Sequence, residues 1–236
     1  MKRVSIILCV FNGEDHILAA CQSLYRMTLP RDQFEVIFVD DGSTDATEER
    51  IRSFQEHSNF RFLKNEANRG LPSACNLGLA HAEAEYVIRL DADDTFESTI
   101  LEEMMPALDR GDTDLVVCDR RERLSDTGRL SVVRLQDSNI YSWVAIGTLM
   151  RRRLLVEIGG YRNLFWEEYD LYIRYLLKSG KPPVRIPRPL LTYSVRRGSM
   201  TSDPRRLEEG WQELRCSWPQ EVLERFGKMP QASLSP

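Results

Sequence analysis

Residues 34–45 read FEVIFVDDGSTD and change character halfway through. The first six, Phe34–Val39, form a short apolar run of β-branched and aromatic side chains, which suits a strand covered on both faces. Asp45 has Glu48 three residues later, which is the spacing of a helix N-cap, and the helix that follows would bury Ile51. The stretch therefore predicts a strand, an acidic turn and a helix.

The same alternation runs through the first half of the chain. A helix is predicted between the first two apolar runs, because its apolar residues fall at positions i, i+1, i+4, i+7 and i+8 from Ile17 to Tyr25. Another follows Gly70, since Pro72 suits the first turn of a helix. This repeat predicts an α/β fold with a Rossmann-like, doubly wound, mostly parallel sheet and helices on both faces. The other apolar runs are Val4–Phe11, Phe60–Leu63, Tyr86–Leu90 and Leu115–Cys118.

The second half is less regular. Residues 120–139 are polar and predict an exposed excursion with a weak strand near Leu130–Leu135. A strand at Trp143–Met150, a short helix at Leu154–Ile158 ended by two glycines and a clear helix at Glu167–Ser179 follow. Two short extended pieces are expected at Val184–Ile186 and Leu190–Val195, between prolines. No linker interrupts the chain, so we expect a single domain over residues 1–230 and a frayed tail at 231–236.

The composition describes an ordinary globular protein of 236 residues, with 42% apolar and 29% charged side chains. The formal charge is −4, so nothing global indicates a nucleic-acid partner. The five cysteines are scattered, odd in number and without a C-x-x-C pair, which argues against disulfides and thiolate metal sites. They are typical of reduced thiols in a cytosolic protein.

The N-terminus superficially resembles a signal peptide, because Lys2 and Arg3 precede an apolar run. That run is only eight residues long and meets Asn12-Gly13-Glu14-Asp15 without a small-residue cleavage site, so a buried strand is the better interpretation. No window reaches the roughly 18 apolar residues that span a bilayer. We expect a cytoplasmic protein without a transmembrane segment, which could rest on the inner face of the membrane.

Acidic side chains follow the predicted strands at the points where ligands bind in open α/β sheets. Asp40 and Asp41 follow the second strand, while Asp91, Asp93 and Asp94 follow the fourth. Five converging carboxylates would repel one another, and a divalent cation such as Mg²⁺ or Mn²⁺ resolves that conflict. Because Mg²⁺ usually takes one or two carboxylates together with substrate phosphates, the pattern points to a diphosphate ligand. For the first two acids, a simple turn role is an equal alternative.

A set of motifs occurs in order along the chain: Val4–Asn12, Val39–Asp45, Asn68-Arg69-Gly70, Leu90–Asp94, Gly159-Gly160-Tyr161, Glu167–Leu171, and Tyr193 followed by Gly198-Ser199-Met200. Together they resemble the family 2 glycosyltransferases over roughly residues 4–200. Each motif is weak alone, but the set is specific in order and spacing. The resemblance implies a GT-A fold, an inverting hexosyltransferase-like mechanism, a UDP-, dTDP- or GDP-sugar donor and a glycan or lipid-linked acceptor. It places donor binding in residues 1–119 and acceptor binding in residues 120–230.

By position in these motifs, the turn at Phe11 and Asn12 would contact the nucleobase and ribose together with Asp40 or Asp41. Glu14 would lie nearby.

Arg69 and Asn76 would line the donor pocket, although a polar residue within a helix is an equally good account of Asn76. In the D-x-D motif, Asp91 would face the ribose or the water shell of the metal, and Asp93 would bind the metal directly. Asp94 would position its neighbours or the donor sugar.

The family normally supplies the catalytic base as the Asp of a Glu-Asp pair at a helix start, and Glu168 stands at that position here. Glutamate has the same chemistry with one more methylene, so its backbone must lie about a bond length further back. We interpret Glu168 as the general base and Asp170 as structural. A carboxylate that merely suits the first turn of a helix is the alternative for Glu168.

A second departure is Arg196-Arg197, where many relatives carry a histidine that ligates the metal or the diphosphate. Arginine stays protonated and cannot ligate a metal, but it can clamp a phosphate. We predict that Arg196 or Arg197 stabilises the leaving diphosphate; a solvated basic loop is the alternative. Residues 181–206 carry seven basic side chains against one acid, and with Arg151–Arg153 they could attract an anionic lipid-linked acceptor.

Two other functions compete. A sugar-phosphate nucleotidyltransferase needs a glycine-rich basic loop after the first strand, but the loop here is Asn12-Gly13-Glu14-Asp15. A catalytically impaired nucleotide-sugar-binding module would explain the departures at Glu168 and Arg196 as lost chemistry. Dehydrogenase and P-loop fingerprints are missing from the sequence. All three histidines, His16 among them, are interpreted as surface residues. Tryptophans are more often core residues than ligand contacts, and Trp166 is the one that could instead stack on an acceptor sugar.

Overall fold

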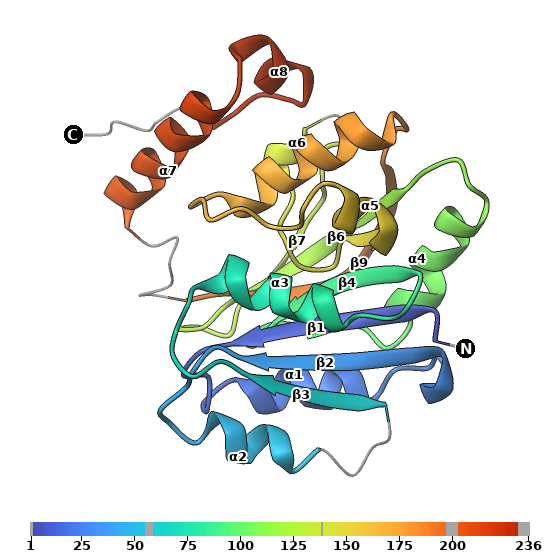
Figure 1. Ribbon diagram of the computed structural model, residues 1–236, viewed down its shortest axis with the longest axis vertical. Helices are drawn as coiled ribbons and strands as arrows, with labels where there is room; N and C mark the ends of the chain where they lie inside the picture. Colours follow the sequence, from blue (N-terminus) through green and yellow to red (C-terminus); the bar gives the residue numbers. More distant parts are fainter. Residues whose placement is uncertain (1, 55–58, 138, 197–202, 231–236) are drawn as a thin grey trace.

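The computed structural model describes residues 2–54, 59–137, 139–196 and 203–230. Their centre is a nine-stranded sheet with the order β3-β2-β1-β4-β8-β6-β9-β5, in which β7 pairs with β6 (Figure 1). The strands are β1 Val4–Val10, β2 Phe34–Asp40, β3 Phe60–Lys64, β4 Tyr86–Asp91, β5 Thr95–Phe96, β6 Leu115–Leu124, β7 Leu130–Val133, β8 Leu149–Arg151 and β9 Val184–Val195.

The first four strands run parallel, as their apolar runs predict. Each residue of β1 pairs with one of β2, from Val4 opposite Phe34 to Val10 opposite Asp40. On its other side β1 pairs with β4, which places Cys9 opposite Asp91. The carboxyl ends of β1, β2 and β4 therefore lie level with one another, and the acidic loops that follow them share one edge of the sheet.

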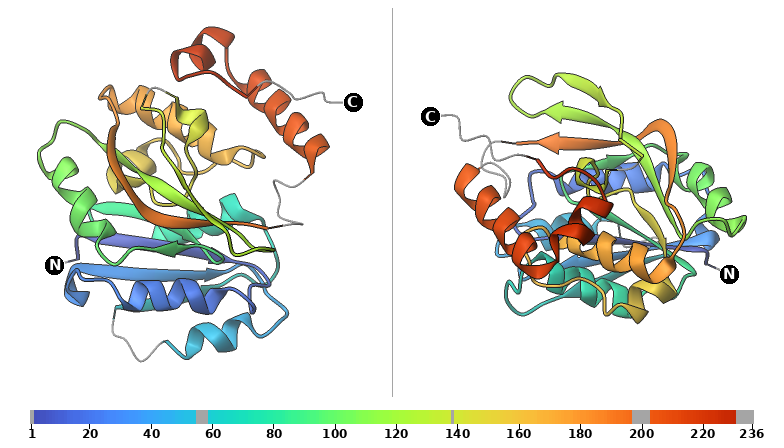
Figure 2. Two further views of the ribbon diagram at one scale, coloured as in Figure 1. Left: turned by 180° about the vertical axis from the view of Figure 1, so that it is seen from behind. Right: turned by 90° about the horizontal axis from the view of Figure 1, so that it is seen from above.

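Helices cover both faces of this sheet, which confirms the doubly wound arrangement (Figures 1 and 2). One face of β1 packs on α1, and the other packs on α3, because alternate residues of a strand point to opposite faces. The helices on the α1 face are α1 Ile17–Tyr25, α2 Thr47–Arg52 and α4 Ile100–Asp109, and those on the α3 face are α3 Leu71–His81, α5 Arg152–Glu157 and α6 Glu167–Ser179.

The second half contains the antiparallel part of the sheet. The short β8 runs antiparallel to both β4 and β6. The expected strand at Trp143–Met150 is wrong over most of its length, because β8 begins only at Leu149 and the chain before it turns at Gly147, which has a φ of 69°. A 3-10 turn (η2, Ile140–Ser142) precedes this stretch. The two pieces expected at residues 184–186 and 190–195 are the ends of one strand, β9, whose pairing with β6 shifts register around Asp119 and so accommodates the prolines.

Two further helices complete the fold, α7 Pro204–Ser217 and α8 Gln220–Arg225, and a 3-10 turn (η1, Arg31–Gln33) precedes β2. The ring of Trp211 in α7 stacks on Trp166 at 4.6 Å and on Tyr169 at 5.3 Å between ring centroids. The indole N–H of Trp218 donates to Asp170 at 3.1 Å. The C-terminal helices are thereby joined to the start of α6. None of the helices in the described ranges is long and apolar enough to cross a membrane, and the expected tail at 231–236 lies outside those ranges.

Gly78 lets α3 approach the sheet closely. A Cβ at this position would lie 2.5 Å from Cγ2 of Ile7 and 3.3 Å from Cγ2 of Val39, and both side chains are buried in the sheet. Gly78→Ala should therefore lower the free energy of unfolding by about 1–2 kcal/mol, because overpacking outweighs the gain in helix propensity. Denaturant unfolding measures this. Ala80→Gly, at an exposed position of the same helix, isolates the propensity term of about 1 kcal/mol; a Gly78→Ala protein at least as stable as wild type would contradict the close approach.

Candidate active site

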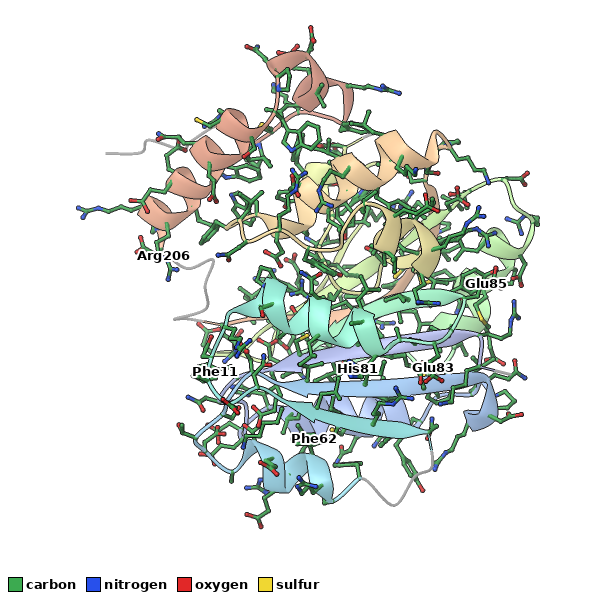
Figure 3. All side chains as sticks on the ribbon, in the orientation of Figure 1. Phe11, Phe62, His81, Glu83, Glu85 and Arg206 are labelled. Atoms are coloured by element: carbon green, nitrogen blue, oxygen red, sulfur yellow. The ribbon has the colours of Figure 1, made fainter. Side chains whose placement is uncertain are left out.

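A cleft of about 630 Å³ opens where the loop after β4, the first turn of α6 and the end of β9 meet. Pockets of this size commonly hold small-molecule ligands. Figure 3 shows Phe11 at this end of the sheet, with Glu83 and Glu85 at the opposite end. The carboxylates that line the cleft are Asp91, Asp93, Asp94, Glu167 and Glu168, and the basic residues are Arg89, Arg120, Arg134 and Arg196.

The loops after β1 and β2 are joined beside the cleft by hydrogen bonds. Asn12 has a φ of 48°, the one positive value among the described residues other than glycine. Its amide N–H donates to Oγ of Ser43 at 2.9 Å, and its Oδ1 accepts from the amide of Thr44 at 3.0 Å. Glu14 similarly accepts from the amide of Ala46 at 2.9 Å. Phe11 is 46% exposed beside this rigid turn, so its ring is free to contact a planar base.

The acids after β2 hold the backbone of the rim and do not line the cleft. Asp40 is fully buried, and its Oδ1 accepts from the amide of Ser43 at 2.8 Å. Its Oδ2 lies 3.6 Å from Nζ of Lys64. Asp45 accepts from the amide of Thr47 at 3.0 Å, and α2 begins two residues later than its N-cap pattern suggested. The expected convergence of all five aspartates is thus replaced by three aspartates and two glutamates.

Asp41 binds the loop that carries Arg69. Its carboxylate accepts from Nδ2 of Asn65 at 2.7 Å, from the amide of Arg69 at 3.1 Å and from the amide of Gly70 at 2.8 Å. The side chain of Arg69 is left exposed at the rim.

We expect Asp41→Asn to lower the free energy of unfolding by about 1–3 kcal/mol, because one acceptor oxygen becomes a donor that faces buried N–H groups. Thermal unfolding checks this, with the exposed rim residue Asp15→Asn as the matched control. Equal melting temperatures for the two variants would show that the hydrogen bonds of Asp41 do not stabilise the rim.

Asn76 clamps two elements and does not reach the cleft. Its Nδ2 donates to the carbonyl of Tyr161 and its Oδ1 accepts from the amide of the same residue, both at 2.8 Å. The neighbouring Gly160 has a φ of 66° and packs against this amide group. Asn76 therefore has the structural role that was the alternative to donor binding.

Asp91 is held by a buried arginine that the sequence motifs did not single out. Arg89 is 3% exposed, and its Nε and Nη2 donate to the two carboxylate oxygens of Asp91 at 2.6 and 2.8 Å. Its Nη1 donates to Oε1 of Glu167 at 2.9 Å. A charged residue in the apolar run Tyr86–Leu90, two positions before an aspartate and so on the same face of the strand, is the signal that could have found it.

Asp93 pairs with Arg196, one of the two arginines expected at the diphosphate. Its Oδ2 accepts from Nε at 2.8 Å and lies 2.7 Å from Nη2. Nη1 of Arg196 donates to Nε2 of His16 at 2.9 Å, so His16 is not the plain surface residue that was expected. Arg197 lies outside the described residues.

Asp94 is buried behind this pair. Its Oδ1 accepts from the amide of Ser194 at 2.7 Å, while its Oδ2 has no hydrogen-bond partner within the described ranges. Burial, reinforced by the negative charges of Asp93 and Asp91, raises the pKa of Asp94 well above its ordinary value. The structure thus places Asp94 as a support for the loop that carries its neighbours.

The acids of the cleft do not form a complete metal site by themselves. Across residues 2–54, 59–137, 139–196 and 203–230, no three Asp, Glu, His or Cys side chains gather as a ligand set. Asp93 binds Arg196 through Oδ2 alone, which leaves Oδ1 as a hard oxygen that can face the cleft. This donor set suits an ion such as Mg²⁺, which takes one or two carboxylates and completes its shell with water and phosphate oxygens.

The two glutamates at the start of α6 differ in environment. Glu167 is 3% exposed and bound by Arg89, whereas Glu168 is half-buried and lines the cleft. Burial, together with the negative charge of Glu167, raises the pKa of Glu168 well above its ordinary value. A carboxylate with a raised pKa in a cleft has the properties of a general base.

Trp166 precedes these glutamates, but one face of its ring is already covered. It stacks on Trp211 at an interplanar angle of 30° and meets Phe165 edge-on at 4.9 Å. The expectation that Trp166 stacks freely on an acceptor sugar therefore does not fit this packing. Its buried indole N–H has no partner within the described residues and lies in the wall of the cleft.

Four of the seven basic residues of segment 181–206 form ion pairs within the protein, namely Lys181, Arg185, Arg188 and Arg196. Arg185 forms a two-pronged pair with Asp119 at 2.7 and 3.0 Å, and Arg188 lies 2.7 Å from Glu103. Lys181 contacts Asp114 at 3.3 Å. Arg151 likewise pairs with Asp114 and Glu85. These pairs weaken the argument for a free cationic surface.

Comparison with known proteins places this geometry among sugar-transferring enzymes. The sequence model described as "Glycosyl transferase family 2" matches residues 5–169. The putative glycosyltransferase EpsH of Bacillus subtilis is 33% identical over 127 residues, which cover 53% of this chain and 36% of EpsH. The poly(ribitol-phosphate) beta-N-acetylglucosaminyltransferase TarS of Staphylococcus aureus is 26% identical over 185 residues, which cover 77% and 31%. The chain thus spans about a third of the length of these curated relatives.

Solved structures share the fold. The crystal structure of Staphylococcus aureus TarS in complex with UDP-GlcNAc has a TM-score of 0.79 at 20% identity, and the match covers 95% of this chain and 71% of that one. The mannosyltransferase PcManGT from Pyrobaculum calidifontis, in complex with GDP-Man and Mn²⁺, has a TM-score of 0.73 at 20% identity, covering 98% and 66%. These likenesses confirm the single-domain GT-A fold. Because the family model spans well over half of the chain, this protein belongs to glycosyl transferase family 2.

Proposed function

We propose that this protein transfers a sugar from a UDP-, dTDP- or GDP-linked donor to an acceptor hydroxyl with inversion, in the assembly of a polysaccharide, glycolipid or cell-surface glycan. The observation that carries the proposal is the position of Glu168, which faces the same cleft as the acid loop Asp91–Asp94. The neighbours that bind UDP-GlcNAc and GDP-Man support the class of donor. The acceptor is a glycan or a lipid-linked sugar.

In this mechanism Glu168 takes the proton of the acceptor hydroxyl as its oxygen attacks the anomeric carbon. The bond from that carbon to the diphosphate breaks on the opposite face, which inverts the configuration. Arg196 stabilises the negative charge that develops on the leaving diphosphate. Asp93, with Asp91 behind it, would hold Mg²⁺ or Mn²⁺, which supplies further positive charge to the diphosphate.

The nucleoside binds at the rim beside the cleft. Phe11 offers an exposed ring to the base, and the rigid Asn12 turn presents its backbone to the ribose. Asp40 or Asp41, together with Glu14, holds this rim in shape through backbone hydrogen bonds. Arg69, which is exposed on the loop that Asp41 holds, would line the donor pocket from the rim.

One assay separates this proposal from its competitors. The protein is incubated with a panel of nucleotide sugars and acceptors, with Mn²⁺ or with a chelator, and release of nucleoside diphosphate is followed. Metal-stimulated release that yields a glycosylated acceptor is the expected result. Pyrophosphate formation from a sugar phosphate and a nucleoside triphosphate would instead identify a nucleotidyltransferase, and donor binding without turnover would identify a binding module.

A further inference from the structure

Arg89 joins the two sides of the cleft through a single guanidinium group. It lies in the middle of the buried strand β4, and its partners belong to different parts of the site. Asp91 ends the same strand and begins the acid loop, whereas Glu167 begins α6 and lies 78 residues after Arg89 in the chain. Both partner contacts are charge-assisted hydrogen bonds, the strongest kind that side chains form.

This bridge also separates the roles of the two glutamates. Arg89 binds Glu167 where both side chains are 3% exposed, so Glu167 cannot turn toward an acceptor without breaking its buried ion pair with Arg89. Breaking a buried pair in this way is strongly destabilising. A guanidinium group stays protonated in proteins, so Arg89 can hold both carboxylates with charge-assisted hydrogen bonds.

We propose that Arg89 is a positioning residue that ties the first turn of α6, and with it the carboxylate of Glu168, to the acid loop on the donor side of the cleft. The inference rests on the proposed function, because it deepens the role of Glu168 as the base. Positioning at this level has large consequences, since rates of bimolecular transfer depend steeply on the alignment of the reacting groups.

The same bridge sets the charge around Glu168. Glu167 raises the pKa of Glu168 and Arg89 lowers it, so the two members of one ion pair act on the base in opposite directions. The variants below leave the other charged and titratable groups around Glu168 unchanged. These are Asp91 at the end of β4, Asp93 and Asp94 after it, Arg120 and Arg134 from the β6–β7 region, Tyr141 in η2, Tyr169 and Tyr172 in α6, Tyr193 in β9 and Arg196 directly after β9.

The test compares the acidic limb of the pH profile of kcat in Glu167→Gln and Arg89→Met. Glu167→Gln keeps a hydrogen-bond acceptor for Arg89 but removes a negative charge, so the limb should move to lower pH. Arg89→Met removes a positive charge, so the limb should move to higher pH, in each case by about one pH unit. Arg89→Lys keeps the positive charge but loses the bidentate hydrogen bonds of the guanidinium. The acidic limb should therefore lie at the wild-type pH, while kcat stays about 10-fold below wild type. A purely structural role would not move the limb in opposite directions.

A second measurement does not depend on turnover. Amide hydrogen exchange in the first turn of α6 should be faster in Arg89→Met than in wild type. Arg185→Met is the matched control, because it removes another two-pronged pair, with Asp119, outside the cleft. If Arg89→Met does not fold, Arg89→Lys and Glu167→Gln carry both tests. An unmoved limb in both variants with unchanged exchange would overturn the inference. A wild-type protein without any transfer would refute the proposed function instead. Amide hydrogen exchange would then still test whether Arg89 holds the first turn of α6.

Discussion

Replacing Glu168 with glutamine is expected to lower the rate of sugar transfer by ~10²-fold or more, while the affinity for the nucleotide-sugar donor stays the same. Glutamine has the same size but cannot accept the proton of the acceptor hydroxyl. Steady-state transfer assays measure the rate, and calorimetry with the nucleoside diphosphate measures donor binding. Glu221→Gln is the matched control, since Glu221 also lies in the first turn of a helix but is exposed. Near-normal transfer by Glu168→Gln would refute its role as the base.

The raised pKa of Glu168 gives this prediction a pH dependence. The base works as a carboxylate, so wild-type transfer should rise with pH through the raised pKa and be lost below it. Burial is the main cause of the shift, and it also means that ionisation of Glu168 costs stability in the folded protein. Glu168→Gln should therefore unfold at a higher temperature than wild type above that pKa, and the difference should vanish below the ordinary carboxyl pKa of about 4. A variant less stable than wild type at neutral pH would contradict the cost of ionising the half-buried Glu168.

Replacing Asp93 with asparagine should abolish the stimulation of transfer by Mn²⁺ and lower the rate on the order of 10²-fold or more, because a metal contributes several kcal/mol to the transition state. The change removes the negative charge that binds both Arg196 and the proposed metal. Arg196 keeps its contact with His16, so positive charge remains at the diphosphate. Transfer assays over a series of Mn²⁺ concentrations check the result.

The control for Asp93→Asn is Asp112→Asn, at an aspartate whose side chain is 80% exposed in the turn before β6. Donor affinity separates two explanations of a loss. If the metal bridges Asp93 and the diphosphate, nucleoside diphosphate should bind more weakly to Asp93→Asn in the presence of Mn²⁺ and equally in its absence. Unchanged stimulation by Mn²⁺ would show that the metal is held elsewhere.

The parallel half of the fold could be predicted because its signals are local. The apolar runs at Val4–Phe11 and Phe34–Val39 form β1 and β2, since continuous burial on both faces is visible within each run. The sequence around Trp143–Met150 does not indicate that most of this stretch is not a strand. Gly147 turns the chain with a positive φ, and that choice depends on the side chains packed around it, including Leu191 of β9.

The individual residues of the candidate site could be predicted from the sequence, but their hydrogen-bond and ion-pair partners could not. The sequence motifs singled out Asp91, Asp93, Glu168 and Arg196, and all four line one cleft. The partners of these groups lie far apart along the chain, so no local pattern contains them. The sequence analysis missed Arg89 for that reason, because its bridging role depends on Glu167, which lies in another element.

The hydrogen bonds of the cleft form at different times during synthesis of the chain. Ser194, whose amide binds Asp94, is synthesised 100 residues after it, and Arg196, which binds His16, is synthesised 180 residues after it. The strands β1 to β4 can assemble as soon as they leave the ribosome, since chains fold from the N-terminus as they emerge. The emerging chain would therefore carry an open row of acids until β9 arrives. A nascent chain halted before residue 196 should hold the parallel strands β1 to β4 but transfer no sugar, because the contacts that Ser194 and Arg196 make in the cleft are then missing.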